Sequence, residues 1–443
     1  MNKNKWMTFL KTTLAASITL PILATQTAVF AEEEASDEVS DVDAESALLL
    51  DFETGQILYN QNADEQKGIA SMTKMLVEYI LFQEIEAGNV SWDTEVTISD
   101  YAHAISQNYA LSNVPLRLGE AYTVEELYEA LAIYSANGAT IALAEEMEGS
   151  EEAFVDRMRE LVESWGIEEY ELYNTTGLNN AFLQDNHYPG SDREDENTMS
   201  AKGIATVAKH LVEDYPQVLE TSSIPTKVFR EGTSDAISMM NWNWMLEGLS
   251  HERLDVDGLK TGTTQFAGAT FTGTAESDGQ RLISVVMGAG DGMADKGQRF
   301  VETSKLLDFG FNEWEFQTIV EADTVLEEES LPVRNGLVEE VSLKTTDELS
   351  YYLPNGTDLE AMNYTFEVDE ELLDQNGQLE APIAEGDAVG ELVIEGDDTI
   401  QFLDGESIES IQVVAAESVE RAGFFTILTT WVKDFFGGLR ARF

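Results

Sequence analysis

The stretch "GIASMTKML", residues 68–76, places a serine and a lysine three positions apart at the expected start of a helix. Apolar residues recur from there to about Ile85 at helical spacing, and Gly88 ends the pattern. Residues three apart lie on one helix face, so the amine of Lys74 can reach the hydroxyl of Ser71. Lysine can activate a serine when burial and a second cation lower its pKa. By itself, however, Ser-x-x-Lys is a frequent chance pattern and favours an ordinary helix start with a lysine facing water.

The sequence around this stretch predicts an α+β domain over residues 44–313. "ALLLDFETGQILYN", residues 47–60, has the pattern of a β-hairpin. A capping box at Thr123 opens a helix, and further helices are expected to about Met147, over 151–166 and over 199–213. Residues 259–289 are expected to form a strand, a turn and a strand. Strands at both ends with helices between them predict one sheet that the N- and C-terminal strands share.

The two ends of the chain predict an exported protein that associates with the outer face of a membrane. Residues 1–31 combine early lysines with a short, proline-interrupted apolar stretch, which favours a secretory signal peptide over a transmembrane anchor. An acidic tether is expected at 32–43, and an all-β domain at 314–416. Residues 417–443 place aromatic and basic residues at helical spacing. This favours an amphipathic membrane anchor over a terminal helix docked on the β domain.

The composition disfavours several classes of function. The 443 residues include 25 Lys and Arg against 84 Asp and Glu, a formal net charge of −59, so we expect no nucleic-acid partner. The four histidines show no paired ligand spacing, and no phosphate-binding glycine loop is found. We therefore expect neither a metal site nor a cofactor. Paired acids are more typical of a solvated surface than of a glycosidase pair.

Two further motifs change the interpretation of Ser71 and Lys74. Ser135-Ala136-Asn137 lies in a turn between two expected helices, and Lys260-Thr261-Gly262 lies at the start of an expected strand. The three motifs, in this order and context, resemble those of the low-molecular-mass penicillin-binding proteins, specifically the serine-type D-alanyl-D-alanine carboxypeptidases of Gram-positive bacteria. The likeness includes "YNTTGLNN", "FREGTSDAISMMNWNWMLEGL" and "DGLKTGTTQFAGATFTGTAESDGQRLISVVMGA", and runs from about Val42 to the end of the chain.

This resemblance implies a penicillin-binding, β-lactamase-like transpeptidase fold, followed by a small β-sandwich and a terminal amphipathic helix. It also implies that Ser71 attacks the peptide bond between two D-alanines of a peptidoglycan stem peptide and that Lys74 takes its proton. Ser135 is implied as the relay of that proton to the departing D-alanine. The implied substrate-binding residues are Asn137, Lys260, Thr261, Gly262, Thr263 and Arg299. For Arg299, an exposed surface arginine is the alternative.

The resemblance further implies that β-lactam antibiotics inhibit the protein covalently, because they leave the same serine acylated. Two other functions share the motifs. One is a serine β-lactamase, which needs a dedicated deacylating carboxylate that the sequence does not locate. The other is a non-catalytic scaffold that binds cell-wall peptides. The acidic segment between His187 and Met199 has no assigned role, although it is a candidate wall of the cleft.

Overall fold

The computed structural model describes residues 42–359, 362, 364–394, 400–404, 410–424 and 427–428. The predicted signal peptide, nearly all of the acidic tether and most of the predicted terminal helix lie outside these residues. Among the described residues, no helix combines the length and apolar character that crossing a membrane requires.

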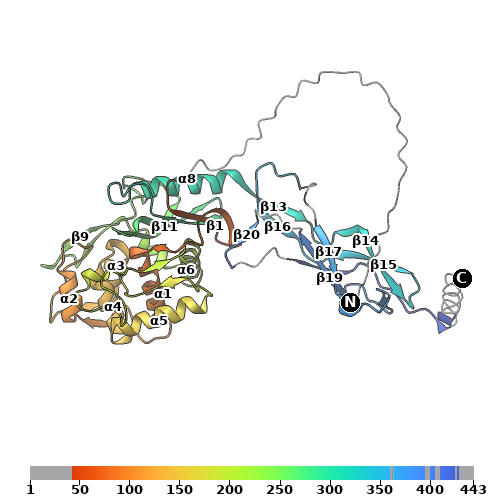
Figure 1. Cartoon of the computed structure of the whole chain (residues 1–443), viewed down its shortest axis with the longest axis horizontal. Helices are drawn as coiled ribbons and strands as arrows, with labels where there is room; N and C mark the ends of the chain where they lie inside the picture. Colours follow the sequence, from red (N-terminus) through yellow and green to blue (C-terminus); the bar gives the residue numbers. More distant parts are fainter. Residues whose placement is uncertain are drawn as a thin grey trace, which may run out of the picture. The chain divides into compact units, whose positions relative to one another are not determined.

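One antiparallel sheet joins strands from both ends of the segment 44–313 (Figure 1). β1 pairs with β12, with Ser46 opposite Met287, as the sequence predicted. The predicted hairpin is formed by β1 and β2, with Leu49 opposite Tyr59. In spatial order the sheet contains β10 (Val256–Thr264), β11 (Gly268–Ser277), β12 (Gln280–Met287), β1 (Ser46–Asp51), β2 (Gln56–Gln61) and β20 (Gln401–Phe402).

The prediction of a single long strand before the Ser277-Asp278-Gly279 turn is wrong. The chain reverses between Thr264 and Gly268, so that this region forms two paired strands, β10 and β11. Threonines on both sides of the reversal, with Phe266 within it and Phe271 after it, continue the strand-like composition, which hides the turn in the sequence. Gly268 has a φ of +66°, a conformation that glycine adopts without strain.

The predicted helices are present, with one change at the helix that follows Ser71. Ser71 lies in a short 3-10 helix, η1 (Ala70–Thr73), and the α-helix begins only at Lys74. The predicted capping box is confirmed, because Glu126 N donates to Thr123 Oγ1 and Thr123 N donates to the Glu126 carboxylate. The helices are α1 (Lys74–Glu86), α2 (Asp100–Ser106), α3 (Val124–Tyr134), α4 (Asn137–Glu148), α5 (Glu151–Ser164), α6 (Ala201–Asp214), α7 (Val218–Ser222) and α8 (Gln298–Glu313).

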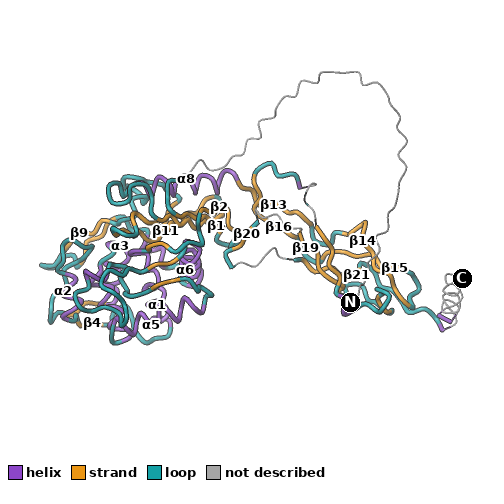
Figure 2. Tube along the Cα trace, viewed as in Figure 1, coloured by secondary structure: helices purple, strands orange, loops and turns teal. Residues whose placement is uncertain are grey.

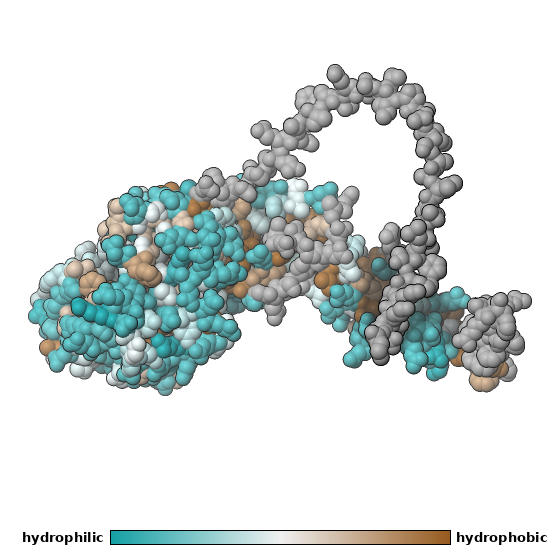
Figure 3. Space-filling view, in the orientation of Figure 1, coloured by the Kyte–Doolittle hydropathy of each residue, from teal (hydrophilic) through white to brown (hydrophobic). Residues whose placement is uncertain are grey.

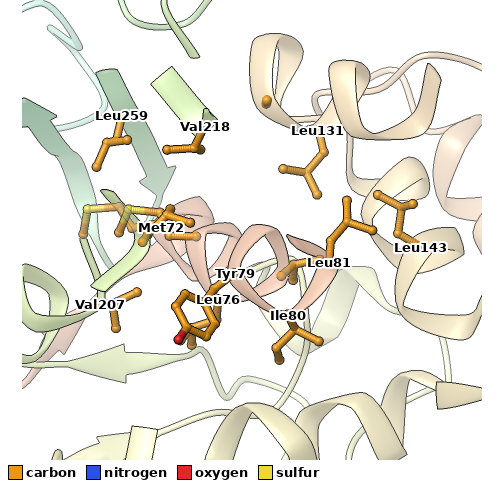
Figure 4. Packing of buried hydrophobic residues seen from close by; sticks show 14 of the residues in the cluster. Met72, Leu76, Tyr79, Ile80, Leu81, Leu131, Leu143, Val207, Val218 and Leu259 are labelled. Carbon is orange, nitrogen blue, oxygen red and sulfur yellow. The ribbon is translucent and has the colours of Figure 1, made fainter. Parts of the chain in front are cut away.

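Helix α1 is enclosed by the rest of the fold and is not an amphipathic surface helix. Every residue from Lys74 to Phe82 is buried. Figure 4 shows α1 residues such as Leu76 and Leu81 among side chains from α3, α4, α6, α7 and β10. A helix that is apolar on most sides belongs in a protein interior. The reactive pair predicted from the sequence therefore lies at the start of the central helix.

The sheet separates two apolar layers. Leu48 and Leu50 of β1 belong to the large cluster that contains α1, whereas Ala47 and Leu49 belong to the cluster that contains Phe300 of α8. This is the alternation expected of a strand with both faces covered. Figure 2 shows helices on both sides of these strands.

In Figure 3 the visible surface over the helices is mostly hydrophilic, as expected for a chain with this many acids.

The rest of the catalytic segment contains short paired strands. They are β3 (Lys67–Gly68), β7 (Thr198–Met199) and β6 (Tyr170–Glu171), β4 (Glu95–Thr97) with β5 (Ala121–Thr123), and β8 (Thr226–Phe229) with β9 (Ile237–Met240). β3 immediately precedes η1 and pairs with β7, which tethers the chain just before Ser71.

The segment after α8 is built from strands, as the alternating runs predicted. β13 (Trp314–Val320) pairs with β16 (Leu349–Pro354). A second sheet contains, in order, β17 (Tyr364–Val368), β19 (Ala388–Ile394), β21 (Ile411–Ala415), β15 (Glu340–Thr345), β14 (Val325–Arg334) and β18 (Leu379–Glu380). These strands enclose an apolar cluster of their own. The domain boundaries proposed from the sequence stay predictions.

Candidate active site

Ser71 and Lys74 are in direct contact. Lys74 Nζ lies 3.0 Å from Ser71 Oγ, 2.9 Å from Asn137 Oδ1 and 2.7 Å from the Thr176 carbonyl oxygen. The last two atoms can only accept hydrogen bonds, and they match the two hydrogens of a neutral amine. When Lys74 is neutral, its lone pair would take the third position, toward the Ser71 hydroxyl. The alternative of a lysine facing water is wrong, because Lys74 is fully buried.

The two polar side chains of the second motif, Ser135 and Asn137, contact different residues. Ser135 ends α3 in the left-handed conformation, with a φ of +57°, and Asn137 is the first residue of α4. Asn137 Nδ2 donates to the Ser112 carbonyl oxygen, which turns its Oδ1 toward Lys74. The amide orientation is therefore fixed by partners on both sides.

The third motif, Lys260-Thr261-Gly262 on the sheet, contacts the second motif through the side chain of Lys260. Lys260 on β10 donates from Nζ to Ser135 Oγ at 3.0 Å and to the Thr261 carbonyl oxygen at 3.1 Å. Lys260 is 3% exposed. The structure thus brings together Ser71, Lys74, Ser135, Asn137 and Lys260, all of which the sequence had singled out.

Arg299 is not a surface residue, so that alternative is wrong. Its side chain is 1% exposed, and its Nη1 donates to the Gly262 carbonyl oxygen at 2.8 Å and to Thr263 Oγ1 at 2.9 Å. These contacts place a guanidinium directly behind the Lys-Thr-Gly strand. Burial lowers the pKa of Arg299, but a guanidinium stays protonated in proteins, so the group is a permanent cation here.

Two glycines allow the segments around Ser71 to approach one another. A Cβ on Gly262 would lie 2.8 Å from the Ile69 carbonyl oxygen and 2.5 Å from Thr270 Oγ1. A Cβ on Gly177 would lie 1.7 Å from the Ala70 carbonyl oxygen, and its φ is +72°. The first glycine lets β10 pack against η1. The second lets the loop that carries Thr176 close on the catalytic serine.

Burial and like charge act together on the lysine pair. Burial is the main cause that lowers the pKa of Lys74 well below its ordinary value, and the charge of Lys260 adds to it. Burial also lowers the pKa of Lys260 to about 8, against the opposing charge of Glu78. Burial and a nearby positive charge each disfavour the charged form of an amine, because the protein interior has a low dielectric constant. Lys74 is consequently the lysine of the pair that is neutral first.

An open cavity of about 530 Å³ lies in front of these groups. Ser71, Ser135, Asn137, Thr261, Gly262, Thr263 and Arg299 line it. Other residues that line it include Phe182, Glu194, Glu196, Trp242 and Lys296. A larger hollow of about 660 Å³ contains none of the motif residues. The chemistry therefore belongs to the smaller cavity. Among the described residues, no group of three or more metal-ligating side chains is found.

Sequence reasoning missed several buried partners of the motifs. Thr176 offers its carbonyl to Lys74, and Glu151 holds the adjoining residue by accepting from Thr175 N and Oγ1. Glu78, one turn after Lys74 on α1, is also buried. Burial raises the pKa of Glu78 to about 7, and the two lysines oppose that rise. Nothing in a chain with this many acids distinguishes these carboxylates before the fold is known.

Comparison with known proteins agrees with this geometry. Residues 31–291 match the family model described as D-alanyl-D-alanine carboxypeptidase, and residues 314–421 match the one described as penicillin-binding protein 5, C-terminal domain. The chain is 28% identical to the D-alanyl-D-alanine carboxypeptidase DacF of Bacillus subtilis, over 88% of this chain and 90% of that protein. It is 32% identical to DacA of Escherichia coli, over 90% of this chain and 89% of that protein.

Solved structures give the same result. The crystal structure of a peptidoglycan synthesis regulatory factor, PBP3, from Streptococcus pneumoniae is 35% identical, with a TM-score of 0.65 over 86% of this chain and 100% of that one. Penicillin-binding protein 5 from Haemophilus influenzae is 27% identical, with a TM-score of 0.62 over 86% of this chain and 98% of that one. The chain belongs to the D-alanyl-D-alanine carboxypeptidase family.

The close approach at Gly177 gives a direct test of the site's geometry. We expect Gly177→Ala to slow acylation by a fluorescent penicillin about 100-fold, because the added Cβ displaces either Thr176 or Ser71. Gly88→Ala is the matched control, since Gly88 has a φ of +74° with no atom within 4 Å of its Cβ position. A folded Gly177→Ala protein that labels as fast as the wild type contradicts the proposed packing.

Proposed function

We propose that the protein is a serine D-alanyl-D-alanine carboxypeptidase that removes the terminal D-alanine from peptidoglycan stem pentapeptides. The observation that carries this proposal is the contact of 3.0 Å between Lys74 Nζ and Ser71 Oγ, with Asn137 and Thr176 accepting from the same amine. Membership of the carboxypeptidase family supports the reaction.

In the acylation step, Ser71 Oγ attacks the carbonyl carbon between the two D-alanines, and its proton passes to neutral Lys74. The negative charge that develops on the carbonyl oxygen is stabilised by the backbone N–H groups of Ser71 and Thr263. The carbon–nitrogen bond then breaks. D-Alanine leaves as its nitrogen takes a proton from Ser135, whose hydroxyl is replenished from Lys260, 3.0 Å away.

In the deacylation step, water attacks the ester carbonyl of the acyl-enzyme. Before this attack, the proton that Lys74 took from Ser71 passes to Lys260 by way of Ser135, which returns Lys74 to its neutral form and Lys260 to its charged form. Lys74 then accepts a proton from the water and gives it to Ser71 Oγ as the ester bond breaks. The shortened stem peptide leaves. No metal or organic cofactor takes part in either step.

Substrate binding follows the polar groups around β10. We propose that Thr261 binds the terminal carboxylate of the substrate, in a field that Lys260 and Arg299 make positive. Support comes from Arg299, whose Nη1 lies 2.9 Å from Thr263 Oγ1. Asn137 Nδ2 is proposed to hold the substrate's amide. A β-lactam presents a similar carboxylate and a strained amide, so it acylates the same serine.

The two other functions suggested by the motifs are less well supported. A β-lactamase needs a carboxylate that activates water at the acyl-enzyme. The buried carboxylate of Glu196 lines the cavity, but it accepts hydrogen bonds from Thr264 and Asn179. A binding scaffold needs no proton-transfer groups, whereas here Lys74 contacts Ser71 and Lys260 contacts Ser135.

The role of Ser71 can be tested by D-alanine release from a diacetyl-Lys-D-Ala-D-Ala tripeptide. We expect release by the wild type and a loss of at least about 1,000-fold in Ser71→Ala, since the acyl-enzyme cannot form. Ser234→Ala, on an exposed loop, is the matched control and is expected to act as the wild type does. Continued release by folded Ser71→Ala contradicts the proposed mechanism.

The pH dependence of kcat/KM tests the two lysines separately. Lys74 acts as a base only when neutral, so activity is lost as the pH falls through its lowered pKa. Lys260 acts as a cation, so activity is also lost as the pH rises through its pKa of about 8. We expect a bell-shaped profile for the wild type. In Lys260→Arg the alkaline limb moves upward, because arginine keeps its charge, and kcat/KM falls at every pH, because arginine does not release a proton to Ser135. A profile without an alkaline limb contradicts the role of Lys260.

We further propose that residues 1–31 direct export and that residues 417–443 hold the enzyme at the outer face of the cell membrane. The support is the apolar and basic sequence pattern of these ends, in a chain whose relatives are cell-wall carboxypeptidases.

Removal of residues 424–443 tests the anchor, because Val419, earlier in the proposed segment, is buried in the apolar cluster of the β domain. We expect the shortened protein to stay soluble and to release D-alanine at the rate of the full chain, since the removed residues lie far along the sequence from the motifs. The full-length protein is expected to sediment with vesicles that contain anionic lipid. Sedimentation of the shortened protein with the same vesicles contradicts the proposed anchor.

A further inference from the structure

The active-site cavity is electrically asymmetric along β10. The strand runs along it from Thr261 to Thr264, a distance of about 10 Å at 3.3 Å per residue. Lys260 lies at its start, and Arg299 lies behind Gly262 and Thr263. At its far end Thr264 Oγ1 donates to Glu196 at 2.5 Å, and Glu194 also lines the cavity.

This asymmetry fixes the direction in which a stem peptide lies, given the proposed function on which this inference rests. The C-terminal carboxylate belongs at the positive end, beside Thr261 and Arg299. The residues that precede the two D-alanines must then extend the other way, along Thr263 and Thr264, toward the acidic end. The residue directly before D-alanyl-D-alanine reaches the wall that faces this end of the strand.

That wall combines an apolar surface with one carboxylate that has no partner. Leu178 and Phe182 line the cavity, and Phe182 is 46% exposed although it is a large aromatic residue. Glu194 is exposed at their edge, and among the described residues its carboxylate takes part in no hydrogen bond or ion pair.

The segment that carries Glu194 is held firmly in place. The Glu194 carbonyl oxygen accepts from Asn179 Nδ2 at 3.0 Å, and the Asp195 carbonyl oxygen accepts from Asn180 N at 3.0 Å. Buried Glu196 is bonded to both Asn179 and Thr264. This is the acidic segment 187–199 that had no assigned role. The structure gives it one, because its hydrogen bonds fix Glu194 at the cavity edge.

We propose that Leu178, Phe182 and Glu194 form a subsite for an aliphatic side chain that ends in an ammonium group, on the residue that precedes D-alanyl-D-alanine. The methylene groups pack on Phe182 and the ammonium group faces Glu194, as long cationic side chains do at apolar surfaces. Stem peptides carry such a diamino acid at this position. Acylation of its amine, as in a cross-linked stem, removes the charge. The enzyme therefore prefers stems whose amine is free.

The test compares two tripeptides that differ only at this amine. Nα-acetyl-Lys-D-Ala-D-Ala keeps the ammonium group, and the Nα,Nε-diacetyl peptide lacks it. We expect the wild type to show a kcat/KM about fivefold higher for the free amine, the effect of one solvent-exposed ion pair. In Glu194→Gln the ratio is expected to fall to about one, the value without an ion pair. Glu247→Gln, an exposed position outside the cavity, makes the same charge change and keeps the wild-type ratio.

The same assay with a diaminopimelate peptide identifies which diamino acid the subsite serves. If Glu194→Gln lowers kcat/KM more for one of the two peptides, the subsite serves the diamino acid of that peptide. A lower kcat/KM for either peptide supports the subsite. An equal kcat/KM of the wild type for the free and acetylated peptides overturns the subsite while D-alanine release stands. Failure to release D-alanine from any peptide contradicts the proposed function, and the subsite with it.

Discussion

The burial of two lysines against one cavity is the constraint on which the rest of the active site depends. Lys74 is fully buried and Lys260 is 3% exposed, so neither amine is screened by water. A buried charge is costly and a second like charge raises that cost, so the pair favours one neutral amine. In the neutral amine, Asn137 and Thr176 accept its two hydrogens, which leaves the lone pair for Ser71. The basicity of Lys74 toward Ser71 thus follows from its position in the fold.

The rest of the fold supplies that position. Central helix α1 begins at Lys74, and helices from both sides of the sequence shield it from water. β10 packs against the preceding turn because Gly262 has no side chain, and the Thr176 loop closes because Gly177 has none. Three segments distant in the sequence therefore meet at one serine. The acidic segment that carries Glu194 then completes the far wall of the cavity.

The sequence predicted the parts of this arrangement that depend on local pattern. Periodicity located α1, α3, α4, α5 and α6 but not α2, α7 or α8, and the three motifs identified Ser71, Ser135 and Lys260. Sequence patterns failed where tertiary contacts determine the structure. The turn before Gly268 lies within strand-like composition. The burial of Arg299 follows from its contacts with β10, which the sequence does not show. Glu78, Glu151 and Glu194 belong to a chain with 84 acids, in which composition hides the few that matter.

The central claim is that Lys74 is neutral at the pH at which the enzyme works. NMR titration of the protein with ¹³Cε-labelled lysine measures this directly, with the Lys74 signal assigned by its loss in Lys74→Arg. The account predicts that Lys74 titrates well below the other lysines, owing to burial and to Lys260. A Lys74 signal that stays protonated up to about pH 10, as in an exposed lysine, would contradict it.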